Sequence, residues 1–172
     1  MSENPMTKVR LEKVTLNMGA GEPGPKLENC KKMLEAISGK EIVTTSTHKR
    51  STFGPGGRQI GVKVTFRGNE AMEILKRMLH AVENKIKPDQ FDKTGNFSFG
   101  VAEYINIPGT SYDPDIGMLG LDVSVTLTKP GFRVKKRKIR PSKIGKSQLI
   151  TKEEAIEFAE KKLGINVTEV EE

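Results

Sequence analysis

Four stretches of the chain alternate apolar and polar residues, with an apolar side chain at every second position except 103, which is Glu103. They cover residues 14–18, 60–66, 97–107 and 119–127. Because successive side chains of a β-strand point to opposite faces, this period of two predicts strands that are buried on one face only. Residues 41–47 do not alternate but are rich in β-branched side chains, so we predict a further strand there.

Three other stretches place apolar residues at helical spacing. In residues 25–38 they recur at three- and four-residue intervals and stop before Gly39, a typical residue just beyond a helix end. The clearest amphipathic pattern follows Asn69, which we interpret as an N-cap, and ends at Pro88. Thr151 and Glu154 form a capping-box pattern that predicts a last helix, through about residue 163.

Together these elements predict an α+β fold. We expect two layers, with a mostly antiparallel five-stranded sheet that carries helices on one face and leaves the other face free. The chain would form a single domain overall. Within it we distinguish an α+β body at residues 1–128, a basic extension at 129–150 and an acidic C-terminal helix at 151–172 that packs on or near the body.

The uncovered face of the predicted sheet would display short hydroxyls and cations. Composition alone gives equal weight to a binding surface and to a merely solvated face. Tyr104 is the one aromatic residue that the pattern places there, so stacking of bases on the sheet is not expected. The outward positions of three predicted strands are Lys13, Thr15, Asn17, Lys63, Thr65, Arg67, Ser124, Thr126 and Thr128.

Positive charge is concentrated in one segment. The chain carries 29 Lys and Arg against 22 Asp and Glu, a net charge of +7, and nine of the cations lie between Lys129 and Lys146 with no acid among them. Such a strip is typical of a polyanion-binding arm, in which Phe132, Val134 and Ile139 would anchor the backbone locally. We therefore expect recognition of folded RNA through its backbone and shape.

The chain also contains the dinucleotide-binding pattern Gly19-x-Gly21-x-x-Gly24, between a predicted strand and a predicted helix. It supports one alternative function, a nucleotide-binding α/β enzyme. That fold needs a parallel strand buried on both faces, whereas residues 14–18 alternate. Residues 145–147 resemble the end of a phosphate-binding loop, but Arg140 stands where its first glycine would be.

No arrangement of side chains in the sequence indicates catalysis. Cys30 lies on the apolar stripe of the first predicted helix, His80 lies off the stripe of the second, and Asp113 and Asp115 shape a turn. We therefore expect no enzyme, no cofactor, no structural metal and no small-molecule substrate. No apolar run reaches the roughly 18 residues of a membrane span or resembles a signal peptide, so we expect a soluble, cytoplasmic protein without membrane contact.

Five motifs that occur in a fixed order carry a family resemblance. They are NMGAGE at residues 17–22, KVTFRG at 63–68, GNFSFGV at 95–101, DIGMLGLDV at 115–123 and PGFRV at 130–134. With them, residues 9–163 resemble the large-ribosomal-subunit protein five family in its archaeal-type branch. The resemblance implies a structural protein of the central protuberance. Its implied partners are 5S rRNA, large-subunit rRNA, neighbouring large-subunit proteins and, through a loop, the P-site tRNA.

The resemblance also implies roles for particular residues. Asn17, Thr65 and Arg67 match family positions on the 5S-binding sheet face. That face is the polar one predicted above, so two lines of reasoning converge on it. The full set that we assign to 5S rRNA binding is Lys13, Thr15, Asn17, Thr45, Lys63, Thr65 and Arg67.

Two further sets follow from the same resemblance. In the tRNA-facing loop, Gly-Pro-Gly-Gly-Arg replaces the family's usual Arg-Glu-Gly-x-Pro, the loop is a few residues shorter, and Arg58 is the best single candidate. The loop consists of Phe53, Gly54, Pro55, Gly56, Gly57, Arg58 and Gln59. The residues assigned to other rRNA contacts are His48, Lys49, Arg50, Arg133, Lys135, Lys136, Arg137, Lys138, Arg140 and Lys143.

Overall fold

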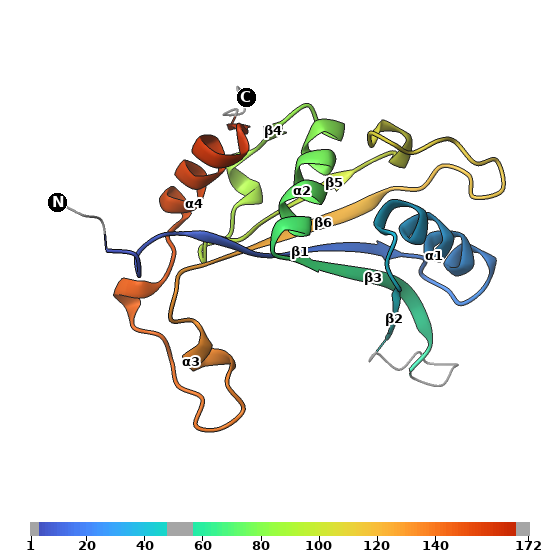
Figure 1. Ribbon diagram of the computed structural model, residues 1–172. Helices are drawn as coiled ribbons and strands as arrows, with labels where there is room; N and C mark the ends of the chain where they lie inside the picture. Colours follow the sequence, from blue (N-terminus) through green and yellow to red (C-terminus); the bar gives the residue numbers. More distant parts are fainter. Residues whose placement is uncertain (1–3, 48–56, 168–172) are drawn as a thin grey trace.

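The protein is built on a five-stranded antiparallel sheet (Figure 1). The computed structural model describes residues 4–47 and 57–167. The strand order is β2-β3-β1-β6-β5, and each neighbouring pair is antiparallel. The predicted α+β class is confirmed. The strands are β1 Arg10–Gly19, β2 Val43–Ser46, β3 Gln59–Arg67, β5 Phe97–Val101 and β6 Leu121–Thr128.

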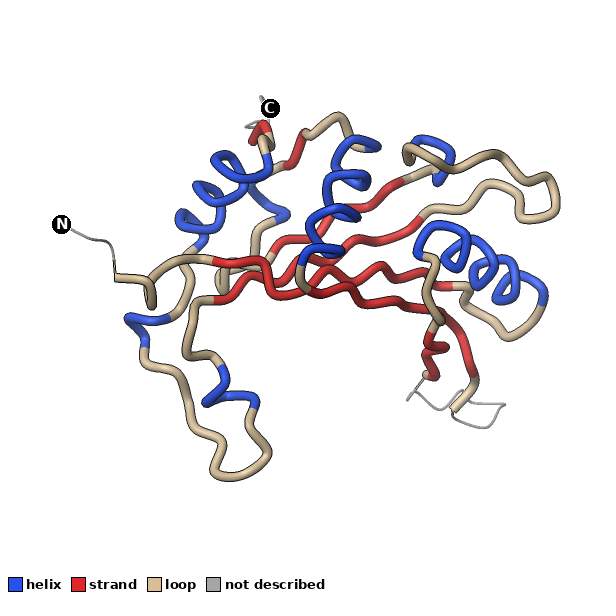
Figure 2. Tube along the Cα trace, in the orientation of Figure 1, coloured by secondary structure: helices blue, strands red, loops and turns tan. Residues whose placement is uncertain are grey.

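Helices cover one face of the sheet (Figure 2). α1 Pro25–Ser38 and α2 Asn69–Ala81 lie on this face, and α4 Lys152–Phe158 lies on the same side near the start of β1. The short α3 Arg133–Lys136 lies on the opposite side, in the basic segment. Within the described residues, no helix combines the length and apolar character needed to cross a membrane.

The core fills the space between the sheet and these helices. β1 contributes Val14, Leu16 and Met18, and the facing helices contribute Leu34 from α1 and Leu75 from α2, all fully buried. Each such side chain gains roughly 1.5–3 kcal/mol when it leaves water. The alternation of apolar residues therefore decides which face of each strand turns toward the helices.

α1 has the bounds that the sequence predicts. Pro25 occupies its first turn, where a missing N–H costs no intrahelical hydrogen bond. Gly39 closes the other end in the left-handed conformation, with φ 60°, and its N–H donates to the carbonyl of Glu35 at 2.8 Å. Cys30 lies on the buried stripe, as predicted.

α2 differs from its prediction at both ends. Its N-cap is Gly68, and Asn69 is already helical. The helix ends at Ala81 and not near Pro88, because Glu83 and Asn84 both take left-handed φ values of 56° and redirect the chain. The turn leads into β4 Lys85–Ile86, which pairs in parallel with β7 Asn166–Val167 near the other end of the chain.

The strand predicted at residues 97–107 is also shorter. β5 ends at Val101 and a 3₁₀ turn, η2 Tyr104–Asn106, follows. Tyr104 is therefore not on the polar face: its side chain is buried, and its hydroxyl accepts a hydrogen bond from the N–H of Asp113 at 3.0 Å. A 3₁₀ turn repeats every three residues, so Tyr104 and Ile107 both point inward, whereas Ile105, which the alternation places on the apolar face, is 37% exposed.

The last helix confirms the predicted capping box. The hydroxyl of Thr151 accepts from the N–H of Glu154 at 3.3 Å, and the Glu154 carboxylate accepts from the N–H of Thr151 at 3.2 Å. After α4 the chain continues as a π-helical turn, Ala159–Leu163. This turn ends at Gly164, which has a left-handed φ of 65°. Phe158 belongs to the core of the body, so this helix and the sheet share one apolar interior.

Candidate nucleic-acid interface

The sheet face opposite α1 and α2 is polar and accessible. Strand register places its side chains in three rows that run across the sheet from β3 through β1 to β6 and β5. Six of the seven residues assigned to 5S rRNA binding stand in these rows. The first row holds Arg67, Lys13 and Thr126, the second holds Thr65, Thr15, Ser124 and Ser98, and the third holds Lys63, Asn17, Asp122 and Gly100.

The middle row consists entirely of hydroxyl side chains. The Oγ1 atoms of Thr15 and Thr65 lie 3.5 Å apart, and Ser124 and Ser98 continue the row onto β6 and β5. Neighbouring strands lie roughly 4.8 Å apart, so four strands spread the hydroxyls over about 14 Å. Each hydroxyl can donate and accept, which gives the centre of the face hydrogen-bonding capacity without charge.

The charges of this face are separated. Lys63 and Arg67 are exposed on β3, and Lys13 is half-buried beside them on β1. Asp122 is exposed on β6, directly across from Asn17. The β3 side therefore attracts phosphate, whereas the β6 side presents a carboxylate that repels it.

Thr45, the seventh assigned residue, stands at the edge of the same face. It pairs with Gly61, and a Cβ atom at Gly61 would come within 2.8 Å of both the Thr45 hydroxyl and the carbonyl oxygen of Met18. Glycine at position 61 therefore lets the Thr45 hydroxyl lean over the neighbouring strand. Thr45 thus stands in line with Gly61 and Gly19, whereas Val43 is the β2 residue across from Lys63.

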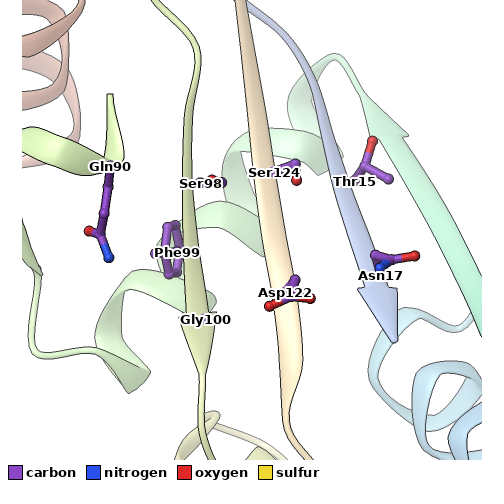
Figure 3. A pocket seen from close by; sticks show the side chains of 8 residues that line it. All are labelled: Thr15, Asn17, Gln90, Ser98, Phe99, Gly100, Asp122 and Ser124. Atoms are coloured by element: carbon purple, nitrogen blue, oxygen red, sulfur yellow. The ribbon is translucent and has the colours of Figure 1, made fainter. Parts of the chain in front are cut away.

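A shallow hollow of about 530 Å³ lies on the polar face over β1, β6 and β5 (Figure 3). Gln90, from the 3₁₀ turn η1 Pro88–Gln90, borders it at the β5 edge. The sequence interpretation singled out neither Asp122 nor Ser98, although both occupy outward positions of predicted strands. The lining residues are Thr15, Asn17, Gln90, Ser98, Phe99, Gly100, Asp122 and Ser124.

Glu12 connects this face to the basic segment. The pairing of β1 with β6 shifts between Leu11 and Lys13, and Glu12 occupies the irregularity. Its carboxylate, only 15% exposed, accepts a hydrogen bond from Nη1 of Arg67 at 3.5 Å and forms an ion pair with Lys136. No sequence pattern indicates this contact, because Glu12 and Lys136 are 124 positions apart.

The basic segment, residues 129–150, is closed at its base. Gln148, in the 3₁₀ turn η3 Lys146–Gln148, donates through Nε2 to the carbonyls of Pro130 at 3.1 Å and Met6 at 2.7 Å. Lys129 is buried and forms an ion pair with Glu154 at 2.7 Å. The two ends of the segment are thus held together, and the residues between them form a loop. Lys129, one of its nine cations, is buried and therefore not available to a polyanion.

The prediction that apolar side chains anchor this segment is also wrong. Ile139 is 78% exposed and Val134 is 37% exposed, while Phe132 alone is half-buried. The anchoring role falls to Lys129 and Gln148 at the base of the loop and to the ion pair between Lys136 and Glu12 along its length. The cations assigned to rRNA contacts, from Arg133 to Lys143, are all exposed.

Comparison with known proteins agrees with this arrangement. Residues 4–53 match the family model described as "Ribosomal protein L5", and residues 59–158 match that of the "ribosomal L5P family C-terminus". The chain is 46% identical to the large ribosomal subunit protein uL5 of Sulfurisphaera tokodaii over 169 residues, 96% of each chain. The chain belongs to the ribosomal protein L5 family.

Other archaeal relatives show the same coverage. The uL5 protein of Nanoarchaeum equitans is 46% identical over 96% of this chain and 99% of its own length, and that of Methanosphaera stadtmanae is 45% identical over 95% and 99%. The resemblance inferred from the five motifs is confirmed, including its archaeal-type branch. This family membership indicates a large-subunit ribosomal protein of the cytoplasm and not an enzyme.

The alternative of a nucleotide-binding enzyme fails on topology as well. β1 is antiparallel to both of its neighbours, β3 and β6, so the glycine pattern after it does not belong to a parallel βαβ unit. Gly21 and Gly24 take positive φ values of 79° and 144° and shape the turn into α1. In this fold the glycine pattern marks a turn between a strand and a helix.

The loop that we predicted to face the tRNA lies largely outside the described residues. His48, Lys49, Arg50, Phe53, Gly54, Pro55 and Gly56 belong to this part of the chain. At its described ends, the N–H of Thr47 donates to the carbonyl of Arg58 at 2.8 Å and the N–H of Gly57 donates to the carbonyl of Thr47 at 3.1 Å. Gln59, which we assigned to the loop, is the first residue of β3.

Proposed function

We propose that this chain binds 5S rRNA on the polar sheet face and joins it to large-subunit rRNA through the basic segment, as part of the central protuberance. The observation that carries the proposal is an uncovered strand face with cations on β3 and uncharged hydroxyls in register beside them. Family membership supports the ribosomal setting. The chain catalyses no reaction in this role.

The mechanism is electrostatic and geometric. Lys63 and Arg67 neutralise phosphates along the β3 side, and release of the counterions from RNA supplies much of the affinity. The exposed cations of the basic segment act in the same way on a second stretch of RNA. Because Glu12 contacts both Arg67 and Lys136, the two basic regions keep a fixed relative position before RNA arrives.

The proposal is tested by measuring 5S rRNA binding over a range of salt concentrations. The variant Lys63→Gln/Arg67→Gln should lose about tenfold or more in affinity, and its log–log salt slope should fall by roughly 1 to 2, since each phosphate contact contributes about 0.9. The matched control is Lys32→Gln/Lys76→Gln, which removes the same charge from exposed positions of α1 and α2. Equal losses in both variants would contradict binding on the polar face.

We also propose that the loop between β2 and β3 contacts the P-site tRNA. Support comes from the family resemblance and from Arg58, an exposed residue at the described end of the loop. In ribosomes that contain Arg58→Gln, cleavage or crosslinking probes on P-site tRNA should report a weaker contact, while 5S rRNA occupancy stays unchanged. Unaltered protection of the tRNA would count against this contact.

The proposed division of the chain follows the same roles. The body, residues 1–128, carries the 5S-binding face, and residues 129–150 form the rRNA-binding extension. The C-terminal helix supports a single-domain organisation because Ala155, Phe158 and Ala159 are buried in the common core. Neighbouring large-subunit proteins remain partners that the family implies.

A further inference from the structure

The polar face is divided into a half that suits phosphate and a half that does not. On β3 the charged groups are Lys63 and Arg67, whereas over β1, β6 and β5 the only charged side chain that lines the described hollow is Asp122. A carboxylate in the hollow repels phosphate and can only accept hydrogen bonds. The hollow therefore needs a ligand that offers donors.

The other residues that line the hollow are uncharged, and most of them are small. Thr15, Ser124 and Ser98 supply hydroxyls from three adjacent strands, and Asn17 supplies an amide beside Asp122 (Figure 3). Gly100, across from Asp122, adds no side chain and keeps the surface shallow. A shallow surface of this kind can lie close to a wide, shallow groove.

The minor groove of an A-form RNA helix has this shape and this chemistry. It is wide and shallow, and it displays 2′-hydroxyls, which both donate and accept. The one base donor on that edge is the amino group of guanine. Both kinds of donor suit Asp122, and the 2′-hydroxyls also suit the row formed by Thr15, Ser124 and Ser98.

We propose that the hollow over β1, β6 and β5 reads the sugar edge of double-helical RNA, with the hydroxyl row bonded to 2′-hydroxyl groups and Asp122 accepting from a 2′-hydroxyl or a guanine amino group. This inference rests on the proposed function of the same face and specifies its chemistry. In this arrangement the phosphates of the bound strand lie toward Lys63 and Arg67. The half of the face that holds the hollow then selects RNA over DNA.

The test is interference by 2′-deoxynucleotides. A pool of 5S rRNA transcripts with sparse 2′-deoxy substitutions is bound to the wild-type protein and to Thr15→Val/Ser98→Ala/Ser124→Ala, which removes three hydroxyls without changing charge. With the wild type, deoxy substitution at a few positions should weaken binding by roughly 2- to 12-fold, the range of one hydrogen bond. With the variant those positions should lose their effect, while the salt slope stays the same.

The outcomes separate this inference from the proposed function. If the wild type does not bind 5S rRNA, the proposed function fails. If the wild type binds but shows no deoxy interference, or the variant keeps the same interference pattern, the function stands and the sugar-edge contact is overturned. Urea unfolding of the variant should match the wild type, because all three positions lie on the surface side of the sheet.

Asp122 is tested separately by Asp122→Asn. If the carboxylate accepts hydrogen bonds from RNA, the amide variant should bind several-fold more weakly. Its side chain has one uncharged acceptor oxygen and a donor NH₂ group in place of two charged acceptor oxygens. If Asp122 only repels RNA, the loss of its charge should strengthen binding and steepen the salt slope. Stronger binding would therefore overturn the role assigned to Asp122.

Discussion

Lys129 and Glu154 form an ion pair at 2.7 Å in which the lysine side chain is only 5% exposed. Nζ of Lys129 also donates to the carbonyl of Leu149 at 3.4 Å. The pair joins the end of β6 to the first turn of α4 and closes the base of the basic segment. A cation counted toward RNA binding in the sequence is thus a structural residue.

Replacing Glu154 by Gln should destabilise the protein. The change leaves the Lys129 ammonium buried without its counter-ion, and losses of this kind amount to about 1.5–3 kcal/mol when a hydrogen bond to a charged group is broken. Gln can still serve in the capping box with Thr151, so the variant isolates the charge. The free energy of unfolding in urea measures the effect.

The control for this prediction is Thr151→Ala, which removes the cap but keeps the ion pair. It should cost about 1 kcal/mol. If Glu154→Gln were no more destabilising than a conservative change at an exposed carboxylate such as Glu28, the structural importance of the buried pair would be refuted.

Replacing Glu12 by Gln should loosen the basic segment. Glu12 holds Lys136 and Arg67 together, and Lys136 belongs to a segment with little apolar anchoring. Trypsin should therefore cleave between Arg133 and Arg140 several-fold faster in the variant, because cleavage requires local opening. Glu28→Gln, on α1, is the matched control. Equal cleavage rates in all three proteins would show that Glu12 does not restrain the segment.

Neutralising part of the basic segment should reduce the salt dependence of rRNA binding. The change Lys135→Gln/Lys138→Gln/Lys143→Gln removes three exposed cations and spares Lys129 and Lys136, which have structural partners. The log–log slope should fall by about 2 to 3 if all three contact phosphate. The control is Lys26→Gln/Lys32→Gln/Lys76→Gln on the helices. An unchanged slope in the first variant would exclude the segment as an electrostatic contact.

Cys30 should be chemically inert in the folded protein. Burial raises the pKa of its thiol, so the reactive thiolate is scarce in the native state. A thiol reagent at pH 8 should react slowly without denaturant and at once in urea. Rapid reaction of the native protein would contradict the buried position.

The same pKa shift makes a prediction for stability. The folded pKa of Cys30 is raised, so its contribution is complete below the unfolded pKa of roughly 8.5 and is lost as pH rises through the folded pKa. The free energy of unfolding should therefore decline above about pH 9 more in the wild type than in Cys30→Ala. If the free energies of unfolding of the wild type and Cys30→Ala showed the same pH dependence, the predicted contribution of Cys30 would be contradicted.

Local patterns in the sequence predicted a large part of this structure. The bounds of α1, the inward faces of β1 and β3 and the capping box of Thr151 all follow from side-chain spacing and from backbone groups that need partners nearby. The polar face is a direct consequence, because residues between inward positions must point outward. Its candidate residues could therefore be named without coordinates.

The prediction failed where distant segments compete with a local pattern. Alternation through residues 97–107 suggests one strand, yet the turn that follows β5 buries Tyr104, which the pattern places outward, and exposes Ile105, which the pattern places inward. α2 stops at Ala81, and the segment after its turn forms β4, which pairs with β7 some 80 positions later in the chain. The burial of Lys129 likewise depends on Glu154 and Leu149, which no nearby residue indicates.

The sequence by itself determined the fold class, the side of each strand that faces the helices and the kind of chemistry that the outer side offers. Only the tertiary structure decided which outward residues stand in the same row, that Glu12 bridges Arg67 and Lys136, and that Asp122 lies in a hollow lined with hydroxyls. The reason is physical. Side-chain periodicity is fixed by the geometry of a few successive residues, whereas strand register and ion pairs depend on how segments far apart in the chain pack together.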